Sequence, residues 1–207
     1  MFITFEGIDF SGKTTQINLL KEYLQKNGKK VEIIREPGGT EISETIRNIL
    51  LDKDNSHMFI ETEIFLFSAA RAQLVREKIR PYLDEGIYVI SDRFHDSTTA
   101  YQGFGRGIDL EVVKRINELA VGSTVPDITF FIDIPVHEAE NRKLQKTRAV
   151  ELDRIEISER QFYEKVREGY IKLSDREKRF RLIDGTKTVE EIHKKIIDAI
   201  VQLDKGV

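Results

Sequence analysis

A motif near the start of the chain has the residue types that bind nucleotide phosphates. Gly7-Ile8-Asp9-Phe10-Ser11-Gly12-Lys13-Thr14 fits the pattern G-x-x-x-x-G-K-[ST] of a phosphate-binding loop, here called the P-loop. Its glycines let backbone N–H groups turn inward around phosphate oxygens, and a following helix adds the positive potential of its N-terminus. Lys13 would reach the β- and γ-phosphates, and the Thr14 hydroxyl would ligate Mg²⁺. The alternative is an ordinary turn, but a strand-like run before the motif and a helical pattern after it favour phosphate binding.

Charged residues follow two further strand-like runs. Arg35-Glu36-Pro37-Gly38-Gly39 follows one of them, and Ser91-Asp92-Arg93-Phe94 follows another. Ligands of open α/β sheets bind beyond the carboxyl ends of the strands, so these segments are candidates for the site. Asp92 could orient Mg²⁺ or its waters, and Arg93 could bind a phosphate through two hydrogen bonds. The alternative for Asp92 and Arg93 is a local ion pair at the surface, which would contribute little to stability.

An aromatic and a basic residue are spaced to share one face of a helix. Phe67 and Arg71 are four residues apart within a helical pattern that we expect to span Glu61–Leu83. Such a pair could stack on a nucleobase and hydrogen-bond its edge. Spacing alone, however, favours the simpler interpretation, in which Phe67 belongs to the core and Arg71 is solvated.

These residues need a scaffold, and the rest of the sequence predicts a doubly wound parallel sheet. Five short β-branched or aromatic runs, several of them apolar at consecutive positions, are typical of strands buried on both faces. They are Phe2–Phe5, Val31–Ile34, Ile87–Ile90, Ile128–Ile134 and Phe180–Ile183. Helical patterns separate them, including one that ends near Asn27-Gly28, one over Ser158–Ser174 and one from Val189 to Leu203. Alternating strands and helices predict an α/β fold.

Composition narrows the classes of protein that remain. The 207 residues contain 40% hydrophobic residues, enough for a sizeable core, and no linker divides them, so we expect a single domain over residues 1–207. The net charge of −3 gives no basic footprint for nucleic acid, and the absence of Cys excludes disulfides and thiolate metal sites. Apolar runs are too short to span a membrane, and no signal peptide is evident, so we expect a soluble cytoplasmic protein. The charged stretch at about 143–159, Lys143–Glu159, is expected to form a mobile lid.

The sequence closely resembles the thymidylate kinases over nearly its whole length. Four motifs carry the resemblance: Phe5-Glu6-Gly7-Ile8-Asp9; Arg35-Glu36-Pro37-Gly38-Gly39-Thr40; Asp92-Arg93-Phe94 continuing through Ser97 to Ala100-Tyr101-Gln102-Gly103; and Leu152-Asp153-Arg154-Ile155-Glu156. The second and third motifs separate this family from other P-loop kinases. The resemblance implies a nucleoside monophosphate kinase-like fold with a five-stranded parallel sheet. It also implies transfer of a phosphoryl group from ATP-Mg²⁺ to dTMP, giving dTDP for dTTP synthesis, by a homodimer.

The resemblance also assigns residues to two substrates. It implies that Phe67 stacks on thymine, that Arg71 hydrogen-bonds the base edge, that Arg93 holds the dTMP phosphate and that Tyr101 crowds the 2′ position of the sugar. Arg142 is implied on the adenine side of ATP. The implied ATP-binding residues are Gly7, Ile8, Asp9, Phe10, Ser11, Gly12, Lys13, Thr14, Thr15, Arg142 and Thr186, and the implied dTMP-binding residues are Asp9, Arg35, Glu36, Pro37, Arg47, Phe67, Arg71, Arg93, Ser97, Thr98, Tyr101 and Gln102. Thr14 and Asp92 are expected at the metal.

One departure from the family pattern concerns the transition-state cation. Some thymidylate kinases carry an arginine in the P-loop and others, of the bacterial type, carry it in the lid. The P-loop here has Phe10 and Ser11 but no arginine. We therefore expect the lid to supply the cation, with Arg148 as the main one and Arg154 in support, beside Lys13, Asp9 and Arg93 as catalytic residues.

Two other functions remain open from the residues. One is a kinase of broader specificity for pyrimidine monophosphates. The other is a nucleotide-dependent switch, which would need the P-loop but no second phosphate site. Candidates for such a second site, Arg93, Arg35 and Arg47, disfavour the switch, and the chain contains no Asn-Lys-x-Asp motif for guanine.

Overall fold

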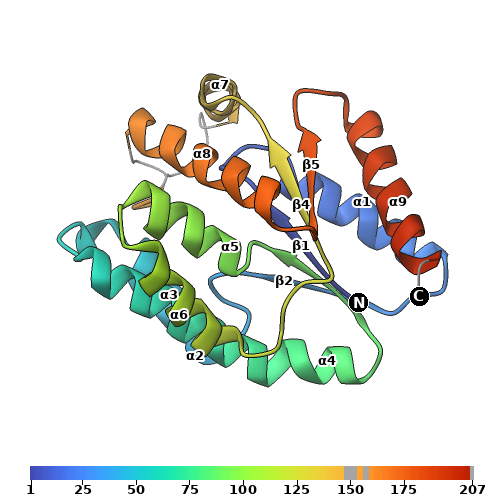
Figure 1. Ribbon diagram of the computed structural model, residues 1–207, viewed down its shortest axis with the longest axis horizontal. Coiled ribbons are helices and arrows are strands. Elements are labelled where there is room, and N and C mark those ends of the chain that lie inside the picture. The colour runs from blue at the N-terminus through green and yellow to red at the C-terminus, as the bar shows by residue number, and fades with distance from the viewer. Residues whose placement is uncertain (147–152, 156–158, 206–207) are drawn as a thin grey trace.

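The computed structural model describes residues 1–146, 153–155 and 159–205, whose five strands form one parallel sheet (Figure 1). The strands are β1 (Phe2–Glu6), β2 (Val31–Arg35), β3 (Tyr88–Asp92), β4 (Ile128–Asp133) and β5 (Phe180–Asp184). Their order is β2-β3-β1-β4-β5, and all pairs are parallel. This order places crossovers on both sides of β1. The predicted doubly wound, five-stranded sheet is thus confirmed, and each predicted strand lies within two residues of the observed one.

Strand register brings the polar strand ends together. Asp92 at the end of β3 is paired with Phe5 of β1 on one side and with Arg35 of β2 on the other. Glu6 ends β1 and leads directly into the P-loop. The carboxyl ends of three neighbouring strands therefore carry the charged segments that the sequence singled out.

Helices cover both faces of the sheet. On one face lie α1 (Lys13–Lys26) and α9 (Val189–Lys205), side by side in Figure 1. On the other face lie α3 (Ile60–Leu74), α6 (Leu110–Val121) and α8 (Arg160–Arg176), with α2 (Glu41–Leu51), α4 (Arg80–Asp84) and α5 (His95–Thr98) next to them. A short 3₁₀ helix, Lys53–Asn55, follows α2, and α7 (Val136–Lys146) includes the first four residues of the predicted lid, 143–146, as regular helix. No helix of the described ranges is both long and apolar enough to cross a membrane.

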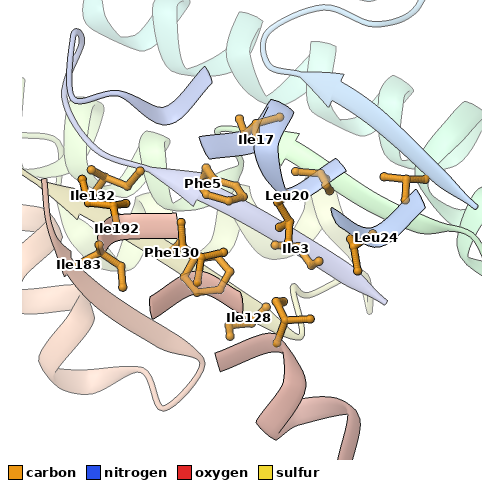
Figure 2. Packing of buried hydrophobic residues seen from close by; sticks show 14 residues of the cluster. Ile3, Phe5, Ile17, Leu20, Leu24, Ile128, Phe130, Ile132, Ile183 and Ile192 are labelled. Carbon is orange, nitrogen blue, oxygen red and sulfur yellow. The ribbon is translucent and has the colours of Figure 1, made fainter. Parts of the chain in front are cut away.

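Side chains of the central strands alternate between the two layers. Ile3 and Phe5 of β1 pack toward α1 and α9, where Ile17, Leu20 and Ile192 meet them (Figure 2). Phe2, from the same strand, packs instead into the cluster formed by α3 and α6 on the opposite face. Burial on both faces explains why the strands are apolar at consecutive positions. The rigid sheet holds the strand ends, and with them the site, in place.

Two segments depart from regular α-helix. The helix expected over Glu61–Leu83 begins at Ile60, and a π-helical segment over Val75–Ile79 separates α3 from α4. A second π-helical segment, Thr99–Gly105, extends α5 and was not predicted. Its register differs from that of an α-helix, and it carries Tyr101 and Gln102 toward the site. π-Helical turns inside helices are frequent at functional sites.

Candidate functional site

A cavity of about 440 Å³ lies beyond the carboxyl ends of β1, β2 and β3. It is continuous from the P-loop to the first turns after β3 and to the inner side of α3. Of the predicted site residues it brings together Asp9, Phe10, Gly12, Lys13, Thr14, Thr15, Arg35, Glu36, Pro37, Arg47, Phe67, Arg71, Asp92, Arg93, Ser97, Thr98, Tyr101 and Gln102. Every residue predicted to contact dTMP is in this set. Leu51, Asp153 and Ile155 also line the cavity and were not predicted as site residues, although Asp153 and Ile155 belong to one of the quoted motifs.

The P-loop is shaped by two glycines with positive φ. Gly7 has φ 140°, and a Cβ at this position would lie 2.6 Å from the carbonyl oxygen of Ile132, so only glycine fits against β4. Gly12 has φ 101° and directly precedes α1, so that the loop ends at the N-terminus of a 14-residue helix. This is the strand–loop–helix context that phosphate binding requires.

Lys13 folds back over the P-loop. Its ammonium group donates to the carbonyl oxygens of Gly7 at 3.1 Å and Ile8 at 3.0 Å. Burial, together with the nearby charge of Arg93, lowers the pKa of Lys13 to about 8. A phosphate group beside it would favour the charged form and compete for these donors.

Thr14 and Asp92 meet at the edge of the same loop. The Thr14 hydroxyl donates to Asp92 Oδ2 at 3.3 Å. Within the described residues, no group of three His, Cys, Asp or Glu side chains could hold a metal. Mg²⁺ in nucleotide sites usually has few protein ligands, such as a hydroxyl and a carboxylate, and water and phosphate oxygens complete its coordination. The two side chains fit that ion.

Phe10 and Arg142 join the P-loop to the turn after β5. Phe10 adopts a left-handed backbone with φ 64°, is half-buried and lines the cavity. The Arg142 guanidinium donates to the carbonyl oxygens of Phe10 at 3.5 Å, Ser11 at 3.4 Å and Gly185 at 2.9 Å. Thr186, in the same turn, bonds the carboxylate of Asp184 rather than the P-loop. Arg142 therefore connects the P-loop with the turn that contains Thr186, the other residue outside the P-loop segment that was implied at ATP.

Arg93 is held in the centre of the cavity wall. Its backbone is left-handed, with φ 71°, and its side chain is only 16% exposed. Its guanidinium bonds Asp9 at 2.6 Å, the Tyr101 hydroxyl at 3.0 Å, Ser97 at 3.2 Å and the Tyr170 hydroxyl at 3.3 Å. The simpler alternative, an exposed ion pair with Asp92, is therefore wrong. Asp9, in turn, has a lowered pKa: burial alone would raise it, but the charges of Arg93 and Lys13 outweigh burial.

Glu6, a buried carboxylate that was quoted in a motif but not predicted as a site residue, shares hydrogen-bond partners with Arg93. Glu6 is fully buried and accepts from the Phe94 backbone N–H at 2.7 Å, from Ser97 Oγ at 2.6 Å and from the Tyr170 hydroxyl at 2.7 Å. Burial, followed by the charge of Asp96, raises the pKa of Glu6 to about 7 although Arg93 opposes the rise. A charged residue at the end of an otherwise apolar strand was the signal that could have identified it.

Arg71 is buried, not solvated. Its Nε donates to Glu36 at 2.6 Å, and its other nitrogens donate to Thr98 at 2.8 Å, to the Phe94 carbonyl at 3.2 Å and to Asn117 at 3.4 Å. The side chain is 1% exposed, and it still forms part of the cavity wall together with Phe67. The simpler interpretation from spacing, a solvated arginine, is therefore wrong. Asn117, on α6, was not predicted.

Two further arginines surround the β2–α2 segment. Arg35 and Arg47 both donate to the carbonyl oxygen of Pro37, at 3.2 and 2.9 Å, and the Glu36–Pro37 peptide bond is cis. Burial, and then the charge of Arg35, lower the pKa of Arg47. Together with Arg93, which bonds Asp9 of the P-loop, these residues contribute three guanidinium groups to the lining of the cavity.

The predicted lid residues separate into two groups. Arg148 lies outside the described residues. Arg154 is buried, and its guanidinium donates to Glu63 at 2.7 Å and to the carbonyl oxygen of Leu50 at 2.8 Å. These partners lie on α3 and α2, and Arg154 is not part of the cavity wall. A role of Arg154 toward phosphate thus stays a prediction.

Comparison with known proteins agrees with this arrangement. The family model described as thymidylate kinase matches residues 5–196. The thymidylate kinase of Thermoanaerobacter sp. (strain X514) is 50% identical over 202 residues, covering 96% of each chain, and that of Caldanaerobacter subterraneus subsp. tengcongensis is 48% identical over 206 residues, covering 99% of this chain and 97% of the relative. The crystal structure of thymidylate kinase from Ehrlichia chaffeensis superposes with a TM-score of 0.76 at 36% identity, covering 97% of this chain and 98% of that chain. The chain belongs to the thymidylate kinase family, the phosphotransferases that convert dTMP to dTDP.

Proposed function

We propose that this chain transfers the γ-phosphoryl group of ATP to the phosphate of dTMP within the cavity of about 440 Å³. The observation that carries the proposal is the continuity of that cavity between two phosphate-binding regions. The P-loop lines one region, Arg35 and Arg47 line another, and Arg93 lines the same cavity while bonded to Asp9 of the P-loop. A phosphoryl donor and a phosphate acceptor need such a pair of regions within reach of each other.

On the donor side, the P-loop backbone and Lys13 bind the ATP phosphates. Thr14 and Asp92 would hold Mg²⁺, which neutralises developing charge on the phosphate oxygens when bound. Arg142, placed between the P-loop and Gly185, contacts the adenine side. Loss of the Lys13 bonds to the Gly7 and Ile8 carbonyls frees this ammonium group for the transferred phosphoryl.

On the acceptor side, Arg93 holds the dTMP phosphate with Arg35 and Arg47 nearby. Its many hydrogen bonds fix the guanidinium, so that little side-chain freedom is lost when substrate binds. Phe67 stacks on the base, while Ser97, Thr98 and Gln102 line the base pocket. Asp9, Glu36, Pro37 and Tyr101 surround the sugar, where Tyr101 leaves little room for a 2′-hydroxyl.

The chemical step needs positioning more than covalent participation by the protein. An oxygen of the dTMP phosphate attacks the γ-phosphorus, and the bond from that phosphorus to the β-phosphate oxygen breaks, leaving ADP. Fixed cations on both sides stabilise charge that is spread over the transferred group. Lys13 acts from the donor side and Arg93 from the acceptor side. Arg148 is assigned the role of the third cation.

We also propose a cytoplasmic homodimer. Large apolar side chains are exposed on three neighbouring helices, namely Ile42 and Ile49 on α2, Phe65 on α3 and Leu119 on α6. Large exposed apolar side chains gathered on neighbouring helices are typical of association sites. Sedimentation should then give about twice the chain mass of 24.0 kDa, and Phe65→Asp should shift the protein to a monomer.

A panel of acceptors tests the proposed activity. Steady-state assays with ATP-Mg²⁺ and dTMP, dUMP, dCMP, UMP or dGMP should give the highest kcat/KM for dTMP. Similar kcat/KM values for all pyrimidine monophosphates would favour the alternative of a kinase with broader pyrimidine specificity. ATP binding without transfer to any monophosphate would favour the nucleotide-dependent switch. The switch is disfavoured by Arg93, Arg35 and Arg47, because a switch has no use for a second phosphate-binding region.

A further inference from the structure

One buried carboxylate lies directly behind the base pocket. Glu63, on α3, is 2% exposed and is not itself part of the cavity wall. Its Oε1 accepts from Gln102 Nε2 at 2.9 Å, and Gln102 does line the cavity. Two arginines, Arg106 and Arg154, also donate to the same carboxylate, at 3.2 and 2.7 Å.

Glu63 is held in its ionised form. Burial by itself would raise the pKa of Glu63, but the hydrogen bonds from Gln102 and Arg154 and the charge of Arg106 keep it below its usual value. An ionised carboxylate accepts hydrogen bonds and donates none. Gln102 can therefore hydrogen-bond the Glu63 carboxylate in only one way, by turning its amide NH₂ toward Glu63.

This hydrogen bond also determines which end of the Gln102 amide faces the cavity. With its nitrogen bound to Glu63, the amide carbonyl oxygen has no partner among the described residues and is left for a ligand. We infer that Glu63 is a positioning residue that presents the Gln102 oxygen, not its NH₂, to the pyrimidine, and thereby selects thymine or uracil over cytosine. This inference rests on the proposed function, since it takes the base to lie against Gln102.

The donor and acceptor pattern of the bases gives the inference its direction. Thymine and uracil present an N3–H donor next to an O4 acceptor, whereas cytosine presents an N3 acceptor next to an N4 amino donor. The fixed oxygen of Gln102 matches the N3–H donor, and Arg71, which can only donate, matches O4. Cytosine would place acceptor against acceptor and donor against donor, and unpaired polar groups in a buried site are costly.

Replacement of Glu63 by Gln should turn the Gln102 amide over. A glutamine at position 63 has one side-chain amide oxygen. This oxygen would accept from Arg154, which is the closest charged donor. The NH₂ of residue 63 would then face Gln102, whose amide must flip to offer its oxygen in return. Gln102 would consequently present donors to the base. Arg71 would be unaffected and would still disfavour the cytosine amino group.

Binding of two acceptors to the full chain, measured by titration calorimetry without ATP, tests this inference. Glu63→Gln is expected to weaken dTMP binding and to strengthen dCMP binding, so that the ratio of the two Kd values narrows by about tenfold or more. Glu77→Gln is the matched control, because Glu77 also accepts from a glutamine amide, that of Gln73 at 2.7 Å, but is exposed and remote from the cavity. An unchanged ratio in Glu63→Gln would overturn the inference.

A double-mutant cycle separates the effect of Gln102 from that of Arg106 and Arg154, the two arginine partners of Glu63. If Glu63 acts through Gln102, Glu63→Gln should change the dTMP-to-dCMP ratio in the natural background and leave it unchanged in a Gln102→Leu background. A change of equal size in both backgrounds would mean that Glu63 acts through its arginine partners and not through Gln102, and the inference would fail.

One measurement needs no substitution at Glu63. Neutron diffraction of the natural protein with dTMP should locate both amide deuterons of Gln102 on the side of Glu63, and deuterons directed at the base would contradict the inference. Failure of the proposed function is recognised separately. In that case the natural protein would bind neither dTMP nor dCMP at the cavity.

Discussion

Glu6 and Arg93 share one serine hydroxyl: Ser97 Oγ donates to Glu6 at 2.6 Å and accepts from Arg93 at 3.2 Å. The buried acid therefore supports the residue that is proposed to hold the acceptor phosphate. Their opposite charges attract, but burial of Glu6 dominates and raises its pKa to about 7. The two effects together make the stability of this region dependent on pH.

Glu6→Gln should remove a pH-dependent loss of stability. In the unfolded chain Glu6 titrates near the ordinary glutamate pKa of 4.5, whereas in the folded chain its pKa is about 7. Between these values the folded state holds a proton that the unfolded state has lost, so stability falls as pH rises through this window. Relative to Glu6→Gln, the natural protein should lose roughly 3 kcal/mol from pH 4.5 to pH 7 and little above it.

Urea unfolding of both proteins at matched pH values measures this difference. Taking the difference cancels the groups that the two proteins share, among them His95, whose burial lowers its pKa to about 4 and gives a slope of opposite sign. If the two stability curves ran parallel across the window, the assignment of the raised pKa to Glu6 would be wrong.

Lys13 should impose an alkaline limit on ATP use. Because burial and Arg93 lower its pKa to about 8, the free enzyme loses this ammonium charge as pH rises above that value. The value of kcat/KM for ATP, which reports the free enzyme, should therefore fall about tenfold per pH unit there. The Lys13→Arg variant should not show this fall of kcat/KM at high pH, because arginine does not titrate in this range. Lys13→Ala should lower kcat by orders of magnitude at every pH while the fold is retained, and near-normal turnover would refute the P-loop assignment.

Much of the scaffold could be predicted because its signals are local. Apolar strands, the P-loop motif and helix periodicity each extend over a few neighbouring residues, and the structure confirms the resulting sheet. Partners that are distant in sequence could not be found in this way. Arg71 bonds Glu36, which is 35 positions away in the sequence. The spacing of Phe67 and Arg71 does not predict this partner. The π-helical segment Thr99–Gly105 was missed for a related reason, since its residues have no periodicity that distinguishes it from an α-helix.

Arg71→Ala should affect both substrate recognition and stability. The KM for dTMP should rise far more than the KM for ATP, because Arg71 is proposed to contact the base of dTMP and no part of ATP. The same substitution leaves Glu36 buried without its 2.6 Å partner, which should destabilise the fold by about 3–5 kcal/mol. Adding Glu36→Gln should recover part of the stability without restoring the KM for dTMP. Equal increases in the two KM values would assign Arg71 a purely structural role.

Tyr101 should govern discrimination against ribonucleotides. Its ring is 6% exposed and lines the cavity, and its hydroxyl accepts from Arg93 at 3.0 Å. Tyr101→Phe removes the hydroxyl and retains the ring, so the preference for dTMP over its ribonucleotide analogue should fall by about tenfold, the order of one lost contact. Tyr101→Ala should relax it further. Competition assays with the two acceptors measure the ratio of kcat/KM, and an unchanged ratio would place the selection on another residue.

Arg148 is predicted to be the cation that the P-loop lacks. The residues that the P-loop offers at the relevant positions are Phe10 and Ser11, neither of which carries charge, and the Arg154 guanidinium is already bound to Glu63. An arginine that reaches the phosphates only when the transferred group is in place acts on the transition state. Arg148→Ala should therefore reduce kcat by ~10³-fold with little change in either KM, as for the loss of an arginine finger. Arg181→Ala, at an exposed arginine on β5, is the control and should retain activity. Arg154→Ala should lower kcat less than Arg148→Ala does. The reverse order would exchange the two roles, and full activity in both variants would show that the lid supplies no catalytic cation.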